Sequence, residues 1–120
     1  MFPLNFVQMA NPEYRKYAEQ LIATCRTKDV GTMIIKSVTK GPWGEKRHTA
    51  TTWYEPFDKP DEIQRGVNFA LSYDVTGLCT AGDTLVLPMV IQACENFTRL
   101  NKDEIEEMIK SAKQYEPLFT

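Results

Sequence analysis

Five small or polar residues in a row form the strongest candidate for ligand binding in this sequence. They lie between a short apolar segment and an apolar helix, and they are Thr80, Ala81, Gly82, Asp83 and Thr84. Small side chains let a ligand approach the backbone, and the first N–H groups of a helix attract anions. The same residues also suit an ordinary strand-to-helix turn in which Asp83 or Thr84 caps the helix. The sequence leaves both interpretations open.

Lys36 is a second candidate, because it follows Ile35 in an otherwise apolar segment over residues 32–38. Ligands of α/β proteins bind at the carboxyl ends of parallel strands, and Lys36 lies at such an end. An unpaired buried ammonium is costly, so we expect this side chain to reach either water or an anion.

Aromatic residues gather in a long segment over residues 39–58, which we predict to be irregular. Long loops inside small domains are often functional. Trp43, Trp53 and Tyr54 could stack on a planar ring, or they could cover the end of the sheet as structural residues. His48 lies in a charged part of this segment, and we expect it to be solvated.

Three strands, each followed by an amphipathic helix, must position these residues. The predicted strands are 2–7, 32–38 and 75–80, and the helices begin at Pro12, at Pro60 and near Leu85. This alternation predicts βαβ units with a parallel sheet. Its right-handed crossovers place the helices on one face. Parallel sheets need cover on both faces, so the other face and the edge beside 2–7 are predicted to be bare.

Clear start signals support two of the helices. Asn11 precedes Pro12 at one helix start, and Asn101 with Glu104 forms a capping box at the last helix. The helix over 85–97 is apolar on most sides, which is typical of a helix covered on two sides.

Composition limits the possible functions. The 120 residues carry a formal net charge of −2, so no basic surface indicates nucleic acid, and no apolar run is long enough to span a membrane. The three cysteines, Cys25, Cys79 and Cys94, are far apart and fit reduced core thiols of a cytoplasmic protein. A single histidine argues against a zinc site.

In collinear order, the chain resembles the C-terminal part of a bacterial aldo/keto reductase, a (β/α)8-barrel oxidoreductase. Residues 1–6 (MFPLNF) resemble the sixth barrel strand of that family, and 31–36 (GTMIIK) resemble the seventh. Residues 52–56 (TWYEP) with 60–63 (PDEI) are similar to a loop and helix of one bacterial branch. Residues 75–83 are similar to the eighth strand and its cofactor turn, and 101–115 to the appended C-terminal helix. The resemblance implies one partial TIM-barrel domain over 1–120, with about three parallel βα units and a C-terminal helix.

The resemblance also implies a cofactor, NAD or NADP, and a small carbonyl substrate in the full barrel. It maps Ile35 and Lys36 onto the nicotinamide and pyrophosphate region, and residues 80–84 onto the adenosine and phosphate turn. The catalytic residues of the family lie on the first four strands, which this chain does not contain. We therefore expect no carbonyl reduction from this chain by itself, and no catalytic residue is assigned.

Two departures from the family pattern matter. NADP-type members carry Lys, Ser and Arg around the eighth-strand turn, where this chain has Ala81, Gly82 and Leu87. Asp83 would repel a 2′-phosphate and suits a ribose hydroxyl, which favours NAD. Met1 falls where the family often has a glutamine that touches the nicotinamide, as a truncated reading frame would produce.

Two functions therefore remain open at this point. The chain is either the dinucleotide-binding part of a reductase whose other strands lie elsewhere, or a partial-barrel module without catalytic activity. In the second case it would self-associate as a homo-oligomer or dock on a partner chain, because exposed sheet faces and edges tend to pair.

Overall fold

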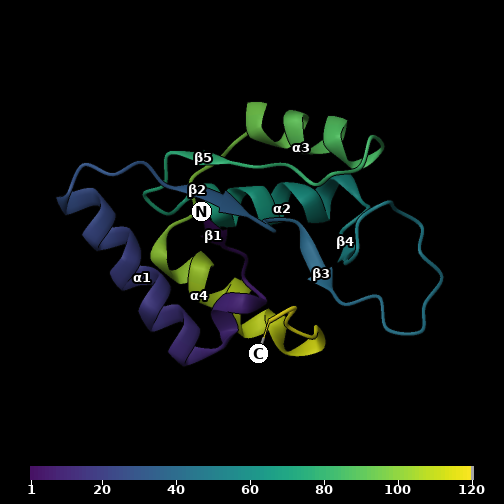
Figure 1. The fold of residues 1–120 in the computed structure, drawn as a ribbon, viewed down its shortest axis with the longest axis horizontal. Helices are drawn as coiled ribbons and strands as arrows, with labels where there is room; N and C mark the ends of the chain where they lie inside the picture. The colour runs from purple at the N-terminus through teal and green to yellow at the C-terminus, as the bar shows by residue number, and fades with distance from the viewer. Residues whose placement is uncertain (120) are drawn as a thin grey trace.

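Three short parallel strands form the central sheet of the structure, a computed structural model that describes residues 1–119. They are β1 (Phe2–Pro3), β2 (Met33–Ile35) and β5 (Gly77–Leu78), in the order β1-β2-β5 (Figure 1). Phe2 lies opposite Ile34, which in turn lies opposite Leu78. The predicted α/β fold with parallel strands is confirmed, but within the described residues the sheet has two edge strands and does not close into a barrel.

Each strand is shorter than the sequence predicts. The chain leaves β1 early because the Asn5 side chain donates from Nδ2 to the Lys36 carbonyl (3.0 Å) and accepts from the Gln8 N–H (2.7 Å). These bonds turn the chain into the 3₁₀ helix η1 (Gln8–Ala10) instead of continuing a strand to Val7. β2 ends at Ile35 because Lys36 has a positive φ of 65°. Side-chain hydrogen bonds and one backbone reversal therefore set these strand ends.

Four α-helices accompany the sheet in the described part of the chain. They are α1 (Pro12–Thr27), α2 (Pro60–Leu71), α3 (Val86–Glu95) and α4 (Lys102–Ser111), the last followed by the 3₁₀ helix η2 (Ala112–Gln114). Asn11 Oδ1 accepts hydrogen bonds from the second and third residues of α1, and Asn101 and Glu104 form the predicted capping box of α4. Both helix starts predicted from sequence are confirmed.

A two-stranded antiparallel hairpin lies within the segment that the sequence predicts to be irregular. Its strands are β3 (Thr39–Gly41) and β4 (Glu55–Pro56), and residues 42–54 connect them as a long loop (Figure 1). The strands are too short to show a hydrophobic period, so the prediction of an irregular segment is wrong at its two ends. The hairpin holds both ends of the long loop.

The core lies on one face of the sheet. Phe2, Ile34 and Leu78 belong to or pack against this core, whereas Met33 on the other face is 38% exposed and Ile35 is half-buried. This second face of the sheet is therefore only partly covered, and we call it the bare face. No helix in residues 1–119 has the length and apolar character needed to cross a membrane.

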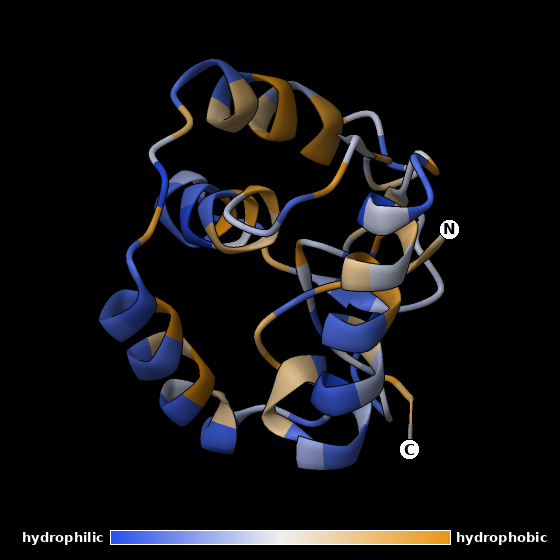
Figure 2. Ribbon diagram, turned by 90° about the vertical axis from the view of Figure 1, so that its left-hand side faces the viewer, coloured by the Kyte–Doolittle hydropathy of each residue, from blue (hydrophilic) through white to orange (hydrophobic). Residues whose placement is uncertain are grey.

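Helix α3 is less covered by other elements than its apolar composition predicts. It packs beside α2, with Val90 and Ala93 buried, but Ile91 is exposed and Leu85, just before the helix, is 74% exposed. Figure 2 shows this mostly apolar helix at the top of the molecule. The expected cover on two sides is not found among the described residues.

Gly66 in α2 gives a stability test. Glycine to alanine in a helix interior ordinarily stabilises by about 1 kcal/mol. At Gly66, however, an added Cβ would lie 2.9 Å from the backbone carbonyl oxygen of Ser37. Gly66→Ala should therefore lower the free energy of unfolding, by about 1–3 kcal/mol, in urea titrations. The neighbouring exposed Arg65→Ala is the control, with an effect within about 0.5 kcal/mol. A Gly66→Ala protein as stable as the wild type would contradict this packing.

Candidate functional site

The carboxyl ends of β2 and β5 meet the long loop at a cavity of about 310 Å³. Its lining comes from three separate segments of the chain: Ile35, Lys36, Thr51, Thr52, Trp53, Tyr54, Thr80 and Gly82. Four of the seven residues predicted to bind a ligand, from both predicted regions, thus share one cavity. We take it as the candidate site, because α/β proteins bind ligands at this edge of the sheet.

Lys36 is the central charged group of the cavity. Its carbonyl accepts from Asn5 Nδ2 (3.0 Å) and from the Thr39 N–H (3.1 Å), and these bonds hold its left-handed backbone. Its Nζ lies 4.3 Å from the centre of the Tyr54 ring and 5.0 Å from that of Trp53. Partial burial lowers the pKa of Lys36 below its ordinary value. The ammonium is therefore oriented by cation–π contacts, which sequence analysis did not predict.

The aromatic residues of the long loop divide into structural and accessible side chains. Trp43 is buried, donates from Nε1 to the Thr52 carbonyl (2.8 Å) and stacks on His48 at 4.6 Å between ring centres. Tyr54 is also buried, and burial raises the pKa of its hydroxyl. Trp53, by contrast, is 61% exposed. Of the three aromatic residues predicted to stack on a planar ring, it is therefore the one whose own ring is accessible.

Asp83 caps α3 and holds the long loop. One carboxylate oxygen accepts from the N–H groups of Leu85 (2.8 Å) and Val86 (3.0 Å). The other accepts from the Thr51 N–H (2.8 Å) and lies 2.9 Å from the Thr51 hydroxyl. These bonds to Thr51, Val86 and Leu85 lower the pKa of Asp83 to about 2. The interpretation of residues 80–84 as a capped turn is thus confirmed.

The capped turn changes what these residues offer to a ligand. Asp83 itself occupies two N–H groups at the start of α3, the groups expected to attract an anion, and both of its oxygens already have partners. Ala81 is buried in the core, and Thr84 is exposed outside the cavity lining. Thr80 and Gly82 are the members of the turn that face the cavity. Cofactor contacts by all five residues of the turn stay a prediction.

Thr51 is a structural residue of the site that sequence analysis missed. Besides its bonds to Asp83, its hydroxyl lies 2.9 Å from the Gly82 carbonyl. The loop is thereby fastened to the turn after β5, a connection across about thirty residues of sequence. The sequence contains only a threonine-rich run at this point, which carries no signal for its distant partner.

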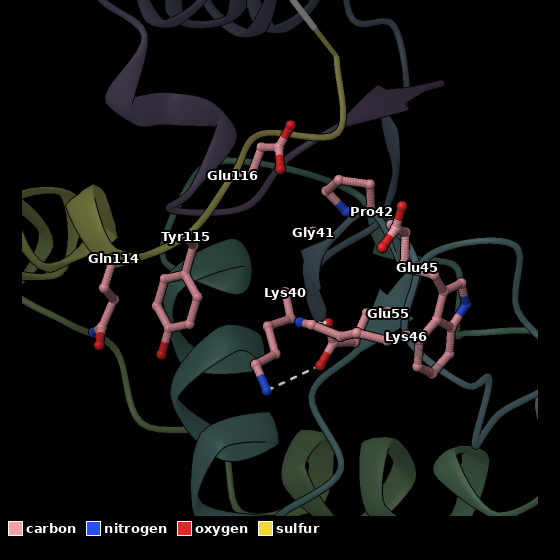
Figure 3. A pocket seen from close by; sticks show the side chains of 11 residues that line it. Lys40, Gly41, Pro42, Glu45, Lys46, Glu55, Gln114, Tyr115 and Glu116 are labelled. Atoms are coloured by element: carbon pink, nitrogen blue, oxygen red, sulfur yellow. Dashed lines mark hydrogen bonds and ion pairs between the residues drawn. The ribbon is translucent and has the colours of Figure 1, made fainter.

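A second and larger cavity, of about 580 Å³, lies between the β3–β4 hairpin and the C-terminal segment (Figure 3). Glu55 forms ion pairs there with Lys40 (3.1 Å) and with Lys46. Burial acts to raise the pKa of Glu55, but hydrogen bonds from Lys46 and Lys40 outweigh it and lower the pKa below its ordinary value. These three charged groups thus satisfy one another, and of the residues that the sequence offers for ligand contacts only Trp43, which is buried, lines this cavity.

No family model, no curated protein and no solved structure matches this chain. Among the residues that the structure describes, no cluster of three or more His, Cys, Asp or Glu side chains could hold a metal ion. Cys25, Cys79 and Cys94 are free thiols, as predicted, but they are half-buried and not fully enclosed in the core.

Substitution of Asp83 tests the turn. Asp83→Asn keeps the shape but lacks the charge and one acceptor oxygen, so at neutral pH we expect a loss of about 1 kcal/mol, as for other helix caps. Because the folded pKa lies near 2, below the ordinary 3.8, the carboxylate stabilises the fold above pH 4. This contribution is lost as the pH falls from about 4 to about 2.

The measurement is urea unfolding of both proteins across this pH range. The difference in unfolding free energy between wild type and Asp83→Asn should shrink towards pH 2. The exposed Asp61→Asn provides a matched control. A difference that does not change with pH would contradict the assigned role of the Asp83 carboxylate.

Proposed function

We propose that this chain is the dinucleotide-binding part of an NAD(P)-dependent oxidoreductase of the aldo/keto reductase type. The observation that carries the proposal is the convergence of Lys36 with Thr80 and Gly82 on one cavity at the carboxyl ends of parallel strands. Residues that the resemblance assigns to the two cofactor regions are 44 to 47 positions apart in sequence, yet they line the same space.

The chemistry of the lining supports a dinucleotide. Lys36 supplies a cation for the pyrophosphate, and the exposed Trp53 ring supplies a surface on which a planar base can stack. Gly82 lets a ligand approach the backbone, because an added Cβ there would meet no atom within 4 Å. When bound, such a cofactor supplies hydride chemistry; the residues of this chain bind and orient it.

The charge of the site favours NAD over NADP. Among the described residues that line the cavity, Lys36 is the one cation, and in this proposal it binds the pyrophosphate. The carboxylate of Asp83 lies next to Gly82 in the chain and opposes a further phosphate. Both oxygens of Asp83 are already hydrogen-bonded, so its charge, and not a contact to a ribose hydroxyl, favours NAD.

Nucleotide binding tests this proposal directly. NADH added to the wild-type chain should quench tryptophan fluorescence, because Trp53 lines the cavity. Lys36→Met should weaken binding about tenfold, which corresponds to the loss of one charge-assisted hydrogen bond. The exposed Lys113→Met is the matched control and should bind as the wild type does. No quenching by NADH or NADPH at millimolar concentration would overturn the proposal.

A second function, a self-associating partial barrel, is favoured by the bare face of the sheet. Met33 is exposed on this face and Ile35 is half-buried there, and Met1, which precedes the edge strand β1, is exposed as well. The edge strands β1 and β5 are both unpaired on their outer sides in residues 1–119. One edge of a sheet can pair with the opposite edge of a second copy, and the bare faces of two copies can pack on one another. A second copy of this chain is therefore the occupant that we propose.

Light scattering tests the self-association. The wild-type chain should exceed the mass of the 13.8 kDa monomer, and Met33→Glu should shift it towards the monomer, because a carboxylate on the bare face opposes its burial. Val30→Glu places the same charge on an exposed apolar residue outside the sheet and should leave the mass unchanged. A wild-type chain that is monomeric at every concentration would exclude this function.

A further inference from the structure

The final residues of the described chain, 115–119, cross several distant parts of the structure; we call them the C-terminal strap. At its start, the Tyr115 ring packs edge-on against Phe57 at 5.4 Å and against Phe6 at 5.8 Å between ring centres. The next residue lies directly on the hairpin, since a Cβ added to Gly41 would come within 2.8 Å of the Glu116 carbonyl oxygen. The strap is therefore closely seated where it leaves η2.

Gln8 anchors the other end of the strap. Its Nε2 donates to the Phe119 carbonyl (2.7 Å), and its Oε1 accepts from the Phe119 N–H (3.2 Å). Gln8 is only 2% exposed, and both polar groups of its side chain bind the backbone of this one residue, 111 positions away. A buried amide without hydrogen-bond partners costs free energy, so these two hydrogen bonds hold the end of the strap in place.

The anchored residue contacts the wall of the ligand cavity. The Phe119 ring meets Trp53 at 6.2 Å between centres, at an angle of 69°. Trp53 in turn meets Tyr54 edge-on at 5.6 Å and lies 5.0 Å from Lys36 Nζ. Because Trp53 is largely exposed, few other groups fix its position. A continuous series of contacts thus leads from Gln8 through Phe119 and Trp53 to Lys36.

We propose that the C-terminal strap holds Trp53 beside Lys36, and that Gln8 is a positioning residue of the cavity because it anchors the strap. The Gln8 amide fixes the backbone of Phe119, the Phe119 ring limits where the Trp53 ring can lie, and Trp53 forms the accessible wall of the cavity. Opening of the strap would free this wall without unfolding the sheet. The proposal concerns the protein without any ligand, so it stands independently of the nature of the cofactor.

Collisional quenching of tryptophan fluorescence by acrylamide tests the strap. Trp43 is buried and Trp53 is exposed, so the accessible fraction reports Trp53, which a Trp53→Phe protein verifies. Gln8→Met keeps the length of the side chain but removes both hydrogen bonds, and it should increase the quenching constant of the accessible tryptophan. Phe119→Ala leaves the Gln8 anchor and removes the ring contact, and it should have the same effect. Gln20→Met, on an exposed position of α1, is the matched control and should leave quenching unchanged.

The outcomes separate positioning from simple stability. A rise in quenching for both variants, with circular dichroism unchanged, supports the strap. If either folded variant quenches as the wild type does, the series of contacts is broken at that residue and the proposal is overturned. If Gln8→Met does not fold, Phe119→Ala decides, because its side chain is partly exposed and lies at the end of the described chain. Absence of NADH binding would contradict the proposed cofactor and would leave this test unaffected.

Discussion

The backbone reversal at Lys36 is the constraint on which the rest of the site depends. A lysine with a φ of 65° costs conformational energy, and the structure meets that cost with hydrogen bonds from Asn5 and Thr39 to its carbonyl. The reversal ends β2, starts the β3–β4 hairpin and directs the ammonium towards Tyr54 and Trp53. Helix α2 packs closely on the backbone of Ser37, the next residue, because Gly66 has no side chain that would separate them. One residue thus joins the sheet, the hairpin and the cavity.

The turn after β5 shows how structural and ligand roles compete for the same groups. Asp83 uses both carboxylate oxygens, one on the start of α3 and one on Thr51. It thereby closes the long loop onto the sheet but leaves fewer groups for an anion at the helix start. Lys36 and the backbone at Gly82 are consequently the groups of the cavity that remain for the ligand that we propose. A ligand held there depends on the loop being fastened, because Thr52, Trp53 and Tyr54 supply much of the cavity lining.

The distribution of exposed apolar residues links the fold to both proposed functions. Exposed apolar residues lie on the bare face of the sheet, at Met33, and on the helices that follow the first and last strands. On these helices they are Tyr17 and Leu21 of α1 and Ile91 of α3. Further strands and helices would cover these positions in a reductase, and a second copy would cover them in a self-associating module. The same physical need, removal of apolar surface from water, underlies each function.

Much of the fold follows from the sequence alone. Asn11 with Pro12, and Asn101 with Glu104, mark two helix starts through local hydrogen bonds, and the alternation of apolar segments with amphipathic helices indicates the parallel sheet. These features depend on residues a few positions apart, so the chain carries them locally. Lys36 and residues 80–84 were also recognisable, because parallel strands bring their carboxyl ends to one edge.

Tertiary structure decided the rest. The bonds of Thr51 to Asp83, of Asn5 to Lys36 and of Gln8 to Phe119 join residues about 30 to 111 positions apart. The cation–π contacts join Lys36 to Trp53 and Tyr54, which are 17 and 18 positions away in the sequence. No spacing rule relates such pairs, because their proximity arises only when the elements between them have packed. The sequence by itself determined the parallel strands and the helices that follow them, and it offered candidate ligand residues at one edge of the sheet. Packing alone determined which of the candidate side chains remain available to bind it.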